Sequence, residues 1–135
     1  MPDLIVPTDP RYQLGVASMD ETHQEFIELV NKSAKADKEQ FILIFEQLVE
    51  HTKAHFSAEN RLMEETGFHA ILEHKNEHLR VLGELNRIGQ KVAAGSILMG
   101  RAYVKEQLPG WFDLHAITMD SALAAHIRSS RVMPV

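Results

Sequence analysis

Cysteine is absent from this chain, as are a long apolar run and a start of the kind that directs secretion. Without cysteine there is no disulfide, which favours a reducing, cytoplasmic environment. A membrane-spanning helix needs about 18 consecutive apolar residues, so we expect no membrane insertion. The first residues do not join a basic segment to an apolar one, which argues against a secretory signal.

An excess of basic residues is also missing. The net charge is −5, and it is spread along the chain, so nucleic acid is not expected as a partner. The 135 residues, 44% of them hydrophobic, suffice for one core without disulfides. We therefore expect one domain over residues 1–135. What the chain has in excess is histidine, with eight residues.

Residues 1–18 contain three prolines and no helical period, which predicts an extended N-terminal arm packed over one end of the domain. The rest has the apolar periodicity of helices. We expect them over about 19–36, 38–66, 71–94 and 97–128, with Gly67 and Gly95 at two of the turns. Pro109 and Gly110 interrupt the last helix and should bend it. Four helices with short connections predict an all-α, antiparallel up-down-up-down four-helix bundle.

Histidines and carboxylates occur at helical spacings on all four predicted helices. Glu59 lies eight residues before Gly67 and His74 seven residues after it, so both lie roughly 10 to 12 Å from that turn. The same comparison at the other turns places further histidines at this depth, namely His23, His55, His78 and His115. A single histidine on an amphipathic helix usually lies at the edge of a core. Histidines at the same depth on four predicted helices, however, indicate a shared site. These five imidazoles, with the carboxylates of Glu59 and Asp120, suit two metal ions about 3.5 to 4 Å apart, although imidazole alone does not identify the metal.

The segments that carry these residues resemble the hemerythrin family in order and spacing. They are LGVASMDETHQEF from Leu14, HFSAENRLM from His55, HKNEH from His74 and WFDLHAITMD from Trp111. The resemblance implies two iron ions bridged by an oxo or hydroxo group, with dioxygen as their ligand. It assigns His74, His78 and His115 to one iron, His23 and His55 to the other, and Glu59 and Asp120 to both. The implied function is reversible dioxygen binding for storage, transport or delivery, without catalysis.

Other functions remain open at this stage. A di-iron sensor of oxygen or nitric oxide and a weak di-iron peroxidase would use the same residues, and a protein partner for delivery or signalling is unknown. The segment His74–His78 also matches the zinc-protease pattern H-x-x-E-H, with Glu77 as general base. That reading leaves the other ligands unexplained. A carboxylate-rich di-iron enzyme is disfavoured because no glutamate has a histidine three residues later.

The residues around this set have simpler expected roles. Asp20 is predicted to cap the first helix, and His69 to lie in a solvated turn. His51 lies one turn before His55, and His126 lies too far along its helix to join the site.

Two aromatic residues precede His115. Trp111 either fills the core or forms a wall of the metal pocket. Phe112 stands where the family usually has leucine, and either fills the core or faces the bound oxygen.

The family pattern differs from this chain at several positions. The family usually has glutamine at the position of Thr22 and a second glutamate at that of Asn60, and it continues the helix through Leu108–Trp111. His115 and Asp120 are five residues apart, about 140° around an ideal α-helix. We therefore predict a widened, π-type turn between them.

Overall fold

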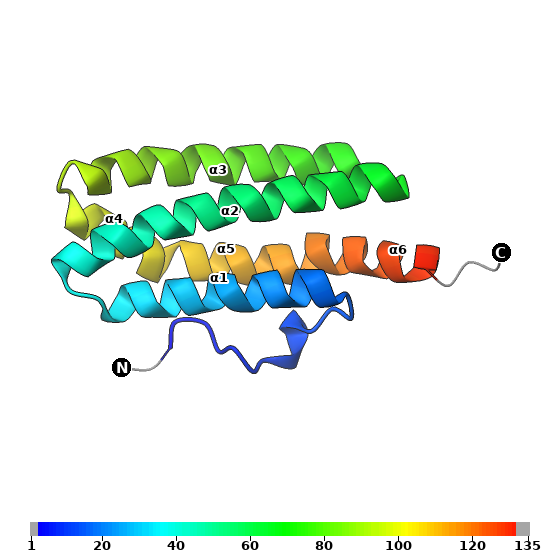
Figure 1. Ribbon diagram of the computed structural model, residues 1–135, viewed down its shortest axis with the longest axis horizontal. Helices are drawn as coiled ribbons and strands as arrows, with labels where there is room; N and C mark the ends of the chain where they lie inside the picture. The colour runs from blue at the N-terminus through cyan, green and yellow to red at the C-terminus, as the bar shows by residue number, and fades with distance from the viewer. Residues whose placement is uncertain (1–2, 132–135) are drawn as a thin grey trace.

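The computed structural model describes residues 3–131, and all regular structure within them is helical. Three long helices, α1 (Ala17–Lys35), α2 (Lys38–Thr66) and α3 (Ile71–Ala93), form three sides of a bundle (Figure 1). The fourth side consists of successive segments: α4 (Ile97–Glu106), α5 (Leu108–His115), the π-helical turn η2 (Ala116–Asp120) and α6 (Ser121–Arg131). The predicted antiparallel four-helix bundle is thereby confirmed.

The turns between the helices follow from a few local residues. After α1 ends at Lys35, with Ala36 as its C-cap, the carboxylate of Asp37 caps α2 by accepting the backbone N–H of Gln40 at 2.8 Å. Gly67 ends α2 in the left-handed conformation, with φ of 63°, which glycine adopts without the steric cost of a Cβ. These stops keep the connections short, so consecutive helices lie antiparallel.

Two apolar clusters occupy the interior. The larger contains Phe41, Phe45, Leu48 and Leu85. The smaller, near the Gly67 turn, contains residues from the start of α1, the end of α2 and α6, including Met63, Leu123 and Ile127. The predicted ligands form a buried polar layer that belongs to neither cluster. Of the helices in residues 3–131, none combines the length and apolar character needed to cross a membrane.

The N-terminal arm lies along α1 (Figure 1) and not over one end of the domain as predicted. Ile5 exchanges two hydrogen bonds with the Asn31 side chain, at 3.0 and 2.9 Å. The Gln24 amide donates to the Pro7 carbonyl, and Asp20 accepts from Leu14. The arm thus runs antiparallel to α1. The arm is not extended throughout as predicted, because Pro10–Tyr12 form a short 3-10 helix, η1, whose N-cap Asp9 accepts the backbone N–H of Arg11. Elsewhere in the arm, carbonyl and N–H groups bind to polar side chains along α1.

The start of α1 also differs from the prediction. The helix begins at Ala17, Val16 occupies the N-cap position, and Asp20 lies in the first turn. Its carboxylate accepts the backbone N–H groups of Leu14 at 2.7 Å and Gly15 at 3.1 Å. Asp20 therefore ties the incoming chain to the helix instead of capping it.

The fourth helix is interrupted where the sequence predicted. The α-helical pattern breaks at Gln107, and Pro109 lies in the first turn of the new segment α5. In Figure 1, α4 slants across one end of the bundle before α5 runs along it. Proline has no N–H to donate to the preceding turn, which explains the break at this position.

Candidate metal centre

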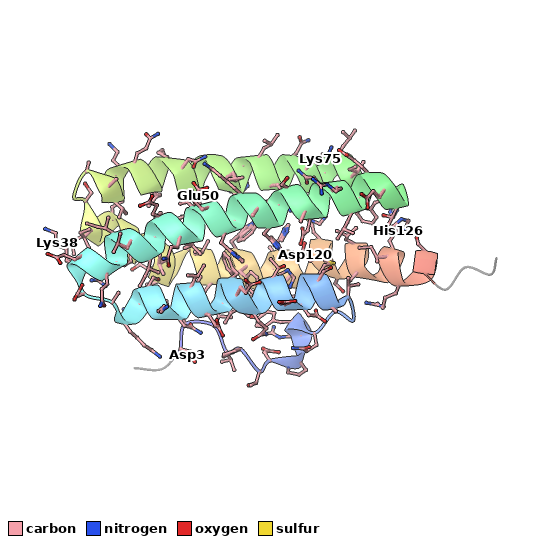
Figure 2. The ribbon with its side chains drawn as sticks, in the orientation of Figure 1. Asp3, Lys38, Glu50, Lys75, Asp120 and His126 are labelled. Carbon is pink, nitrogen blue, oxygen red and sulfur yellow. The ribbon has the colours of Figure 1, made fainter. Side chains whose placement is uncertain are left out.

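Seven buried or nearly buried side chains from all four sides of the bundle meet in one polar layer. Five are imidazoles and two are carboxylates: His23 on α1, His55 and Glu59 on α2, His74 and His78 on α3, His115 on α5 and Asp120 in η2. The structure thus brings together every residue that the sequence predicted as a metal ligand. Figure 2 shows Asp120 between the helices, with His126 farther along α6.

The seven side chains form two groups that share both carboxylates. The first contains His74, His78 and His115, and the second contains His23 and His55. Within each group the potential ligand atoms lie within 4.8 Å of one another. Two ions held in this way would have Glu59 and Asp120 in common.

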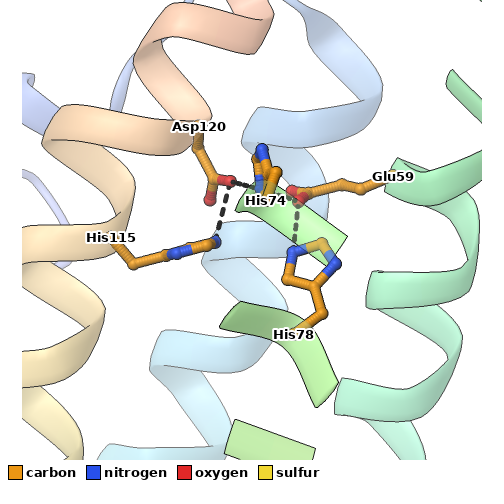
Figure 3. Close-up of side chains that lie close together, drawn as sticks. All are labelled: Glu59, His74, His78, His115 and Asp120. Atoms are coloured by element: carbon orange, nitrogen blue, oxygen red, sulfur yellow. Dashed lines mark ion pairs between the residues drawn. The ribbon is translucent and has the colours of Figure 1, made fainter. Parts of the chain in front are cut away.

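Glu59 directs a different oxygen at each group. Its Oε1 lies 3.2 Å from Nε2 of His74 and 3.1 Å from Nε2 of His78, as Figure 3 shows. Its Oε2 lies 2.9 Å from Nε2 of His55. A carboxylate in this orientation can place one oxygen on each of two ions.

Asp120 repeats this arrangement from the opposite side of the layer. Its Oδ1 lies 3.1 Å from Nε2 of His74 and 3.0 Å from Nε2 of His115. Its Oδ2 lies 2.8 Å from Nε2 of His23. All five imidazoles direct Nε2 at the centre, so the same ring nitrogen of each histidine is available to a metal ion.

The protein atoms alone do not satisfy these groups. Among the described residues, every buried side-chain nitrogen or oxygen that lacks a hydrogen bond of acceptable geometry belongs to this layer. They include both oxygens of Glu59 and Nε2 of His74, His78 and His115. Unsatisfied buried polar groups are rare because each costs about 1 to 3 kcal/mol. Metal ions would satisfy the carboxylate oxygens and the Nε2 atoms among them, so the residues present fit a metal centre.

The electrostatics of the layer point the same way. Burial opposes ionisation of Glu59, but its contacts with His55, His74 and His78 together outweigh burial and hold the pKa of Glu59 well below its ordinary value. Burial likewise opposes a charge on His74, but polar contacts with Asp120 and Glu59 raise the pKa of His74 to about 9. The carboxylates are therefore anionic, and in the absence of metal they raise the pKa of His55 and His74, whereas burial lowers the pKa of His78. Metal ions would replace protons on His55 and His74.

The π-helical turn η2 places Asp120 on the same face as His115. The backbone N–H of Ser121 donates to the carbonyl of Ala116, five residues earlier. A π turn accommodates one residue more than an α turn, so residues five apart come to one face. The π-type widening predicted from the spacing is confirmed.

Comparison with known proteins agrees with this geometry. The family model of the hemerythrin HHE cation binding domain matches residues 14–130. The chain belongs to the hemerythrin family. It is 36% identical over 107 residues to a bacteriohemerythrin of Ralstonia nicotianae, and the match covers 79% of this chain and 77% of that protein. A bacteriohemerythrin of Pseudomonas aeruginosa is 26% identical over 120 residues, covering 86% of this chain and 77% of the relative.

The hemerythrin-type cluster has supporting contacts that sequence reasoning did not find. Nδ1 of His78 donates to Oδ1 of Asn60 at 3.0 Å, which leaves the lone pair of Nε2 directed at the centre. Phe56 stacks on the same ring, with centroids 3.9 Å apart and planes 5° from parallel. The sequence showed Asn60 only as a difference from the family pattern and did not predict its bond to His78. Its position directly after Glu59 was the one sign that it lies near the ligands.

A small cavity of about 10 Å³ adjoins the hemerythrin-type cluster. This is close to the space that one water molecule occupies. Trp111 stacks on His115, with centroids 4.8 Å apart, and its Nε1 donates to Glu77 at 3.1 Å. Phe112 meets the ring of His23 edge-on at 5.4 Å. The lining combines these aromatic rings with polar groups: Phe26, Thr52, His55, Phe56, Trp111, Phe112, His115 and Asp120.

The remaining histidines lie outside both ligand groups. His69 is exposed, as predicted. Nε2 of His126 donates to the Thr66 carbonyl at 2.7 Å, and Nε2 of His51 donates to the Thr22 carbonyl at 3.3 Å. Glu77 contacts Trp111 and Arg80, not the ligand layer. The arrangement is therefore not that of a zinc protease with Glu77 as base.

Proposed function

We propose that this protein binds dioxygen reversibly at two non-haem iron ions, for storage, transport or delivery. In this proposal His74, His78 and His115 hold one ion, His23 and His55 hold the other, and Glu59 and Asp120 bridge them. Residues 1–135 act as one domain, with the N-terminal arm as part of it. Two ferrous ions supply the two electrons that dioxygen binding requires.

The observation that carries the proposal is the division of the carboxylate oxygens between the two histidine groups. Glu59 presents Oε1 to His74 and His78 and Oε2 to His55. A single ion would not require the two oxygens of one carboxylate to face different histidine groups. Two ions about 3.5 to 4 Å apart would each bind one of these oxygens. The three-to-two division of imidazoles also leaves the second group with fewer protein ligands, and so with room for a small molecule.

The size and lining of the cavity favour binding over catalysis on an organic substrate. About 10 Å³ beside His55 and His115 leaves room for a ligand of only a few atoms and none for an organic substrate. Five neutral imidazoles also donate less negative charge to iron than a carboxylate-rich set would. Such a site stabilises high-valent iron poorly, which favours release of dioxygen unchanged.

The test is an absorption spectrum of anaerobically reduced, iron-analysed protein, recorded before and after exposure to air and again after removal of oxygen. We expect two irons per chain and a visible band that appears with air and disappears with deoxygenation. A band that does not reverse would favour a sensor or a peroxidase. A colourless protein, or one loaded with zinc, would refute the proposal.

Phe112→Ala is expected to accelerate irreversible oxidation of the reduced, air-exposed site about tenfold, equivalent to about 1.4 kcal/mol in the barrier. The ring of Phe112 is buried and forms part of the cavity wall. An apolar wall gives an entering water no partners, and the oxidation needs water and protons. The measurement is the first-order decay of the oxygenated spectrum in air.

Phe45→Ala is the matched control, because Phe45 is equally buried and belongs to the same apolar cluster as Phe112 but does not line the cavity. It should lower stability by about 3 to 5 kcal/mol and leave the decay rate unchanged. Equal decay rates for wild type and Phe112→Ala, at unchanged iron content, would show that Phe112 only fills space.

A further inference from the structure

The N-terminal arm reaches the cavity wall from behind through Tyr12. The Tyr12 ring packs against Phe112, with centroids 5.2 Å apart and planes at 52°. Phe112 in turn meets the ring of His23 and stacks on Phe26 at 4.8 Å. On this side the barrier between cavity and solvent is therefore two aromatic rings deep, and the outer ring belongs to the arm.

Asp113 of α5 and Arg11 of the arm form a clamp that holds Tyr12 in place. Its hydroxyl donates to Oδ1 of Asp113 at 2.9 Å, and the guanidinium of Arg11 lies 3.2 Å from the same oxygen. Burial raises the pKa of Tyr12 to about 12, so the hydroxyl remains a donor at neutral pH. Asp113 directly follows Phe112 in the chain. The clamp thus connects the arm to the segment that carries the inner ring.

The arm is tied down on both sides of this contact. Before it, the Gln24 amide donates to the Pro7 carbonyl at 2.9 Å. After it, Asp20 accepts the N–H groups of Leu14 and Gly15. The segment 8–13 between these ties forms a strap, and the half-exposed Arg11 and Asp113 lie where water can compete for their ion pair. The strap can therefore open at the clamp while both of its ends stay attached.

We propose that Tyr12 is a positioning residue that holds Phe112 over the cavity, so that the strap 8–13 gates the passage of small ligands to the metal centre. The inference rests on the proposed function for the existence of an open metal position, but not on dioxygen being the natural ligand. A gate alters the barrier to passage and leaves the bound state unchanged. Its loss must therefore raise the association and dissociation rates by the same factor.

Azide, a small anion that binds ferric ions, is the probe. In stopped-flow experiments on the iron-loaded, oxidised protein, Tyr12→Phe, which loses only the bond to Asp113, should raise both rates about tenfold, the factor for loss of one charge-assisted hydrogen bond. Tyr12→Ala, which also loses the ring contact with Phe112, should raise both rates further. The equilibrium constant should change less than twofold in each variant. A changed equilibrium constant at unaltered association rate would overturn the proposal.

A double-mutant comparison tests whether Tyr12 acts through Phe112. In a Phe112→Ala background, Tyr12→Ala should have little further effect, because contacting residues with one shared role are not additive. Full additivity would contradict the mechanism. Lys35→Ala is the matched control: it removes the contact of Lys35 with Asp3 at 3.0 Å, near the other end of the arm, and should leave both rates unchanged.

Limited trypsin digestion gives a readout that does not depend on ligand binding. Opening of the strap exposes the bond after Arg11, so Tyr12→Ala should be cut there faster than wild type and Lys35→Ala should not. Equal cleavage rates would show that the clamp does not hold the strap. If wild type binds azide but not dioxygen, the proposed function fails while the gate is still tested. Absence of azide binding to wild type would overturn the gate as well.

Discussion

Glu59→Ala and Asp120→Ala proteins are each expected to retain one iron ion per chain or fewer, in place of the proposed two. Each carboxylate presents one oxygen to each histidine group. Its removal takes a ligand from both ions and a negative charge from between two cations about 3.5 to 4 Å apart. Their mutual repulsion in a buried layer is then less compensated. Iron per chain, measured after anaerobic loading with excess ferrous ion and desalting, is the readout.

His126→Ala is the control for this result. His126 is half-buried and hydrogen-bonded to the Thr66 carbonyl, outside both ligand groups. Its replacement should leave two irons per chain. Loss of iron from this variant would show that the ligand layer is wrongly placed along the bundle, and full occupancy in Glu59→Ala or Asp120→Ala would refute the bridging role.

Removal of the metal is expected to lower the midpoint of thermal unfolding by on the order of 15 °C. A ligand present at about 1,000 times its dissociation constant stabilises the folded state by about 4 kcal/mol, and each kcal/mol shifts the midpoint of a domain this size by several degrees. In the metal-free protein several carboxylate and imidazole atoms of this layer stay buried without a hydrogen bond of acceptable geometry. Calorimetry on iron-loaded, chelated and reloaded samples measures the difference.

Reloading should restore the original midpoint, which separates metal loss from damage by the chelator. In Glu59→Ala the chelator should produce a smaller shift, because less metal is bound at the start. Identical midpoints for loaded and chelated wild type would mean that the layer contributes nothing through metal binding. The polar atoms of Glu59 and His74 would then need another explanation.

The helical pattern and the ligand layer were predictable because both depend on regular geometry. A fixed rise per residue places Glu59 and His74 at one depth from Gly67, and this held without knowledge of the packing. The irregular spacing of His115 and Asp120 was equally informative, since only a widened turn puts both on one face. Where regular backbone geometry sets a position, sequence spacing is enough to find it.

The prediction failed where the partner of a group lies far along the chain. The arm runs along α1 because Ile5 bonds to Asn31, 26 residues away, and local composition does not encode such a choice. Asp20 was assigned to a cap because its type and position suit one, but its partners lie in the loop before the helix. The contact of Tyr12 with Asp113 spans 101 residues, and no periodic pattern in the sequence predicts it.

The π turn before α6 also determines which side of that helix faces the interior. On an uninterrupted α-helix, Leu123 and Ile127 would lie about 80° and 120° around from His115, away from the interior. With one residue absorbed by the turn, both fall within about 20° of it, and both are buried. The turn therefore accommodates one additional residue, and the helical segments before and after it keep the same face toward the interior. A chain shortened by one residue between Ala116 and Thr118 could keep both its apolar face and its ligand pair, with His and Asp four residues apart on a regular helix.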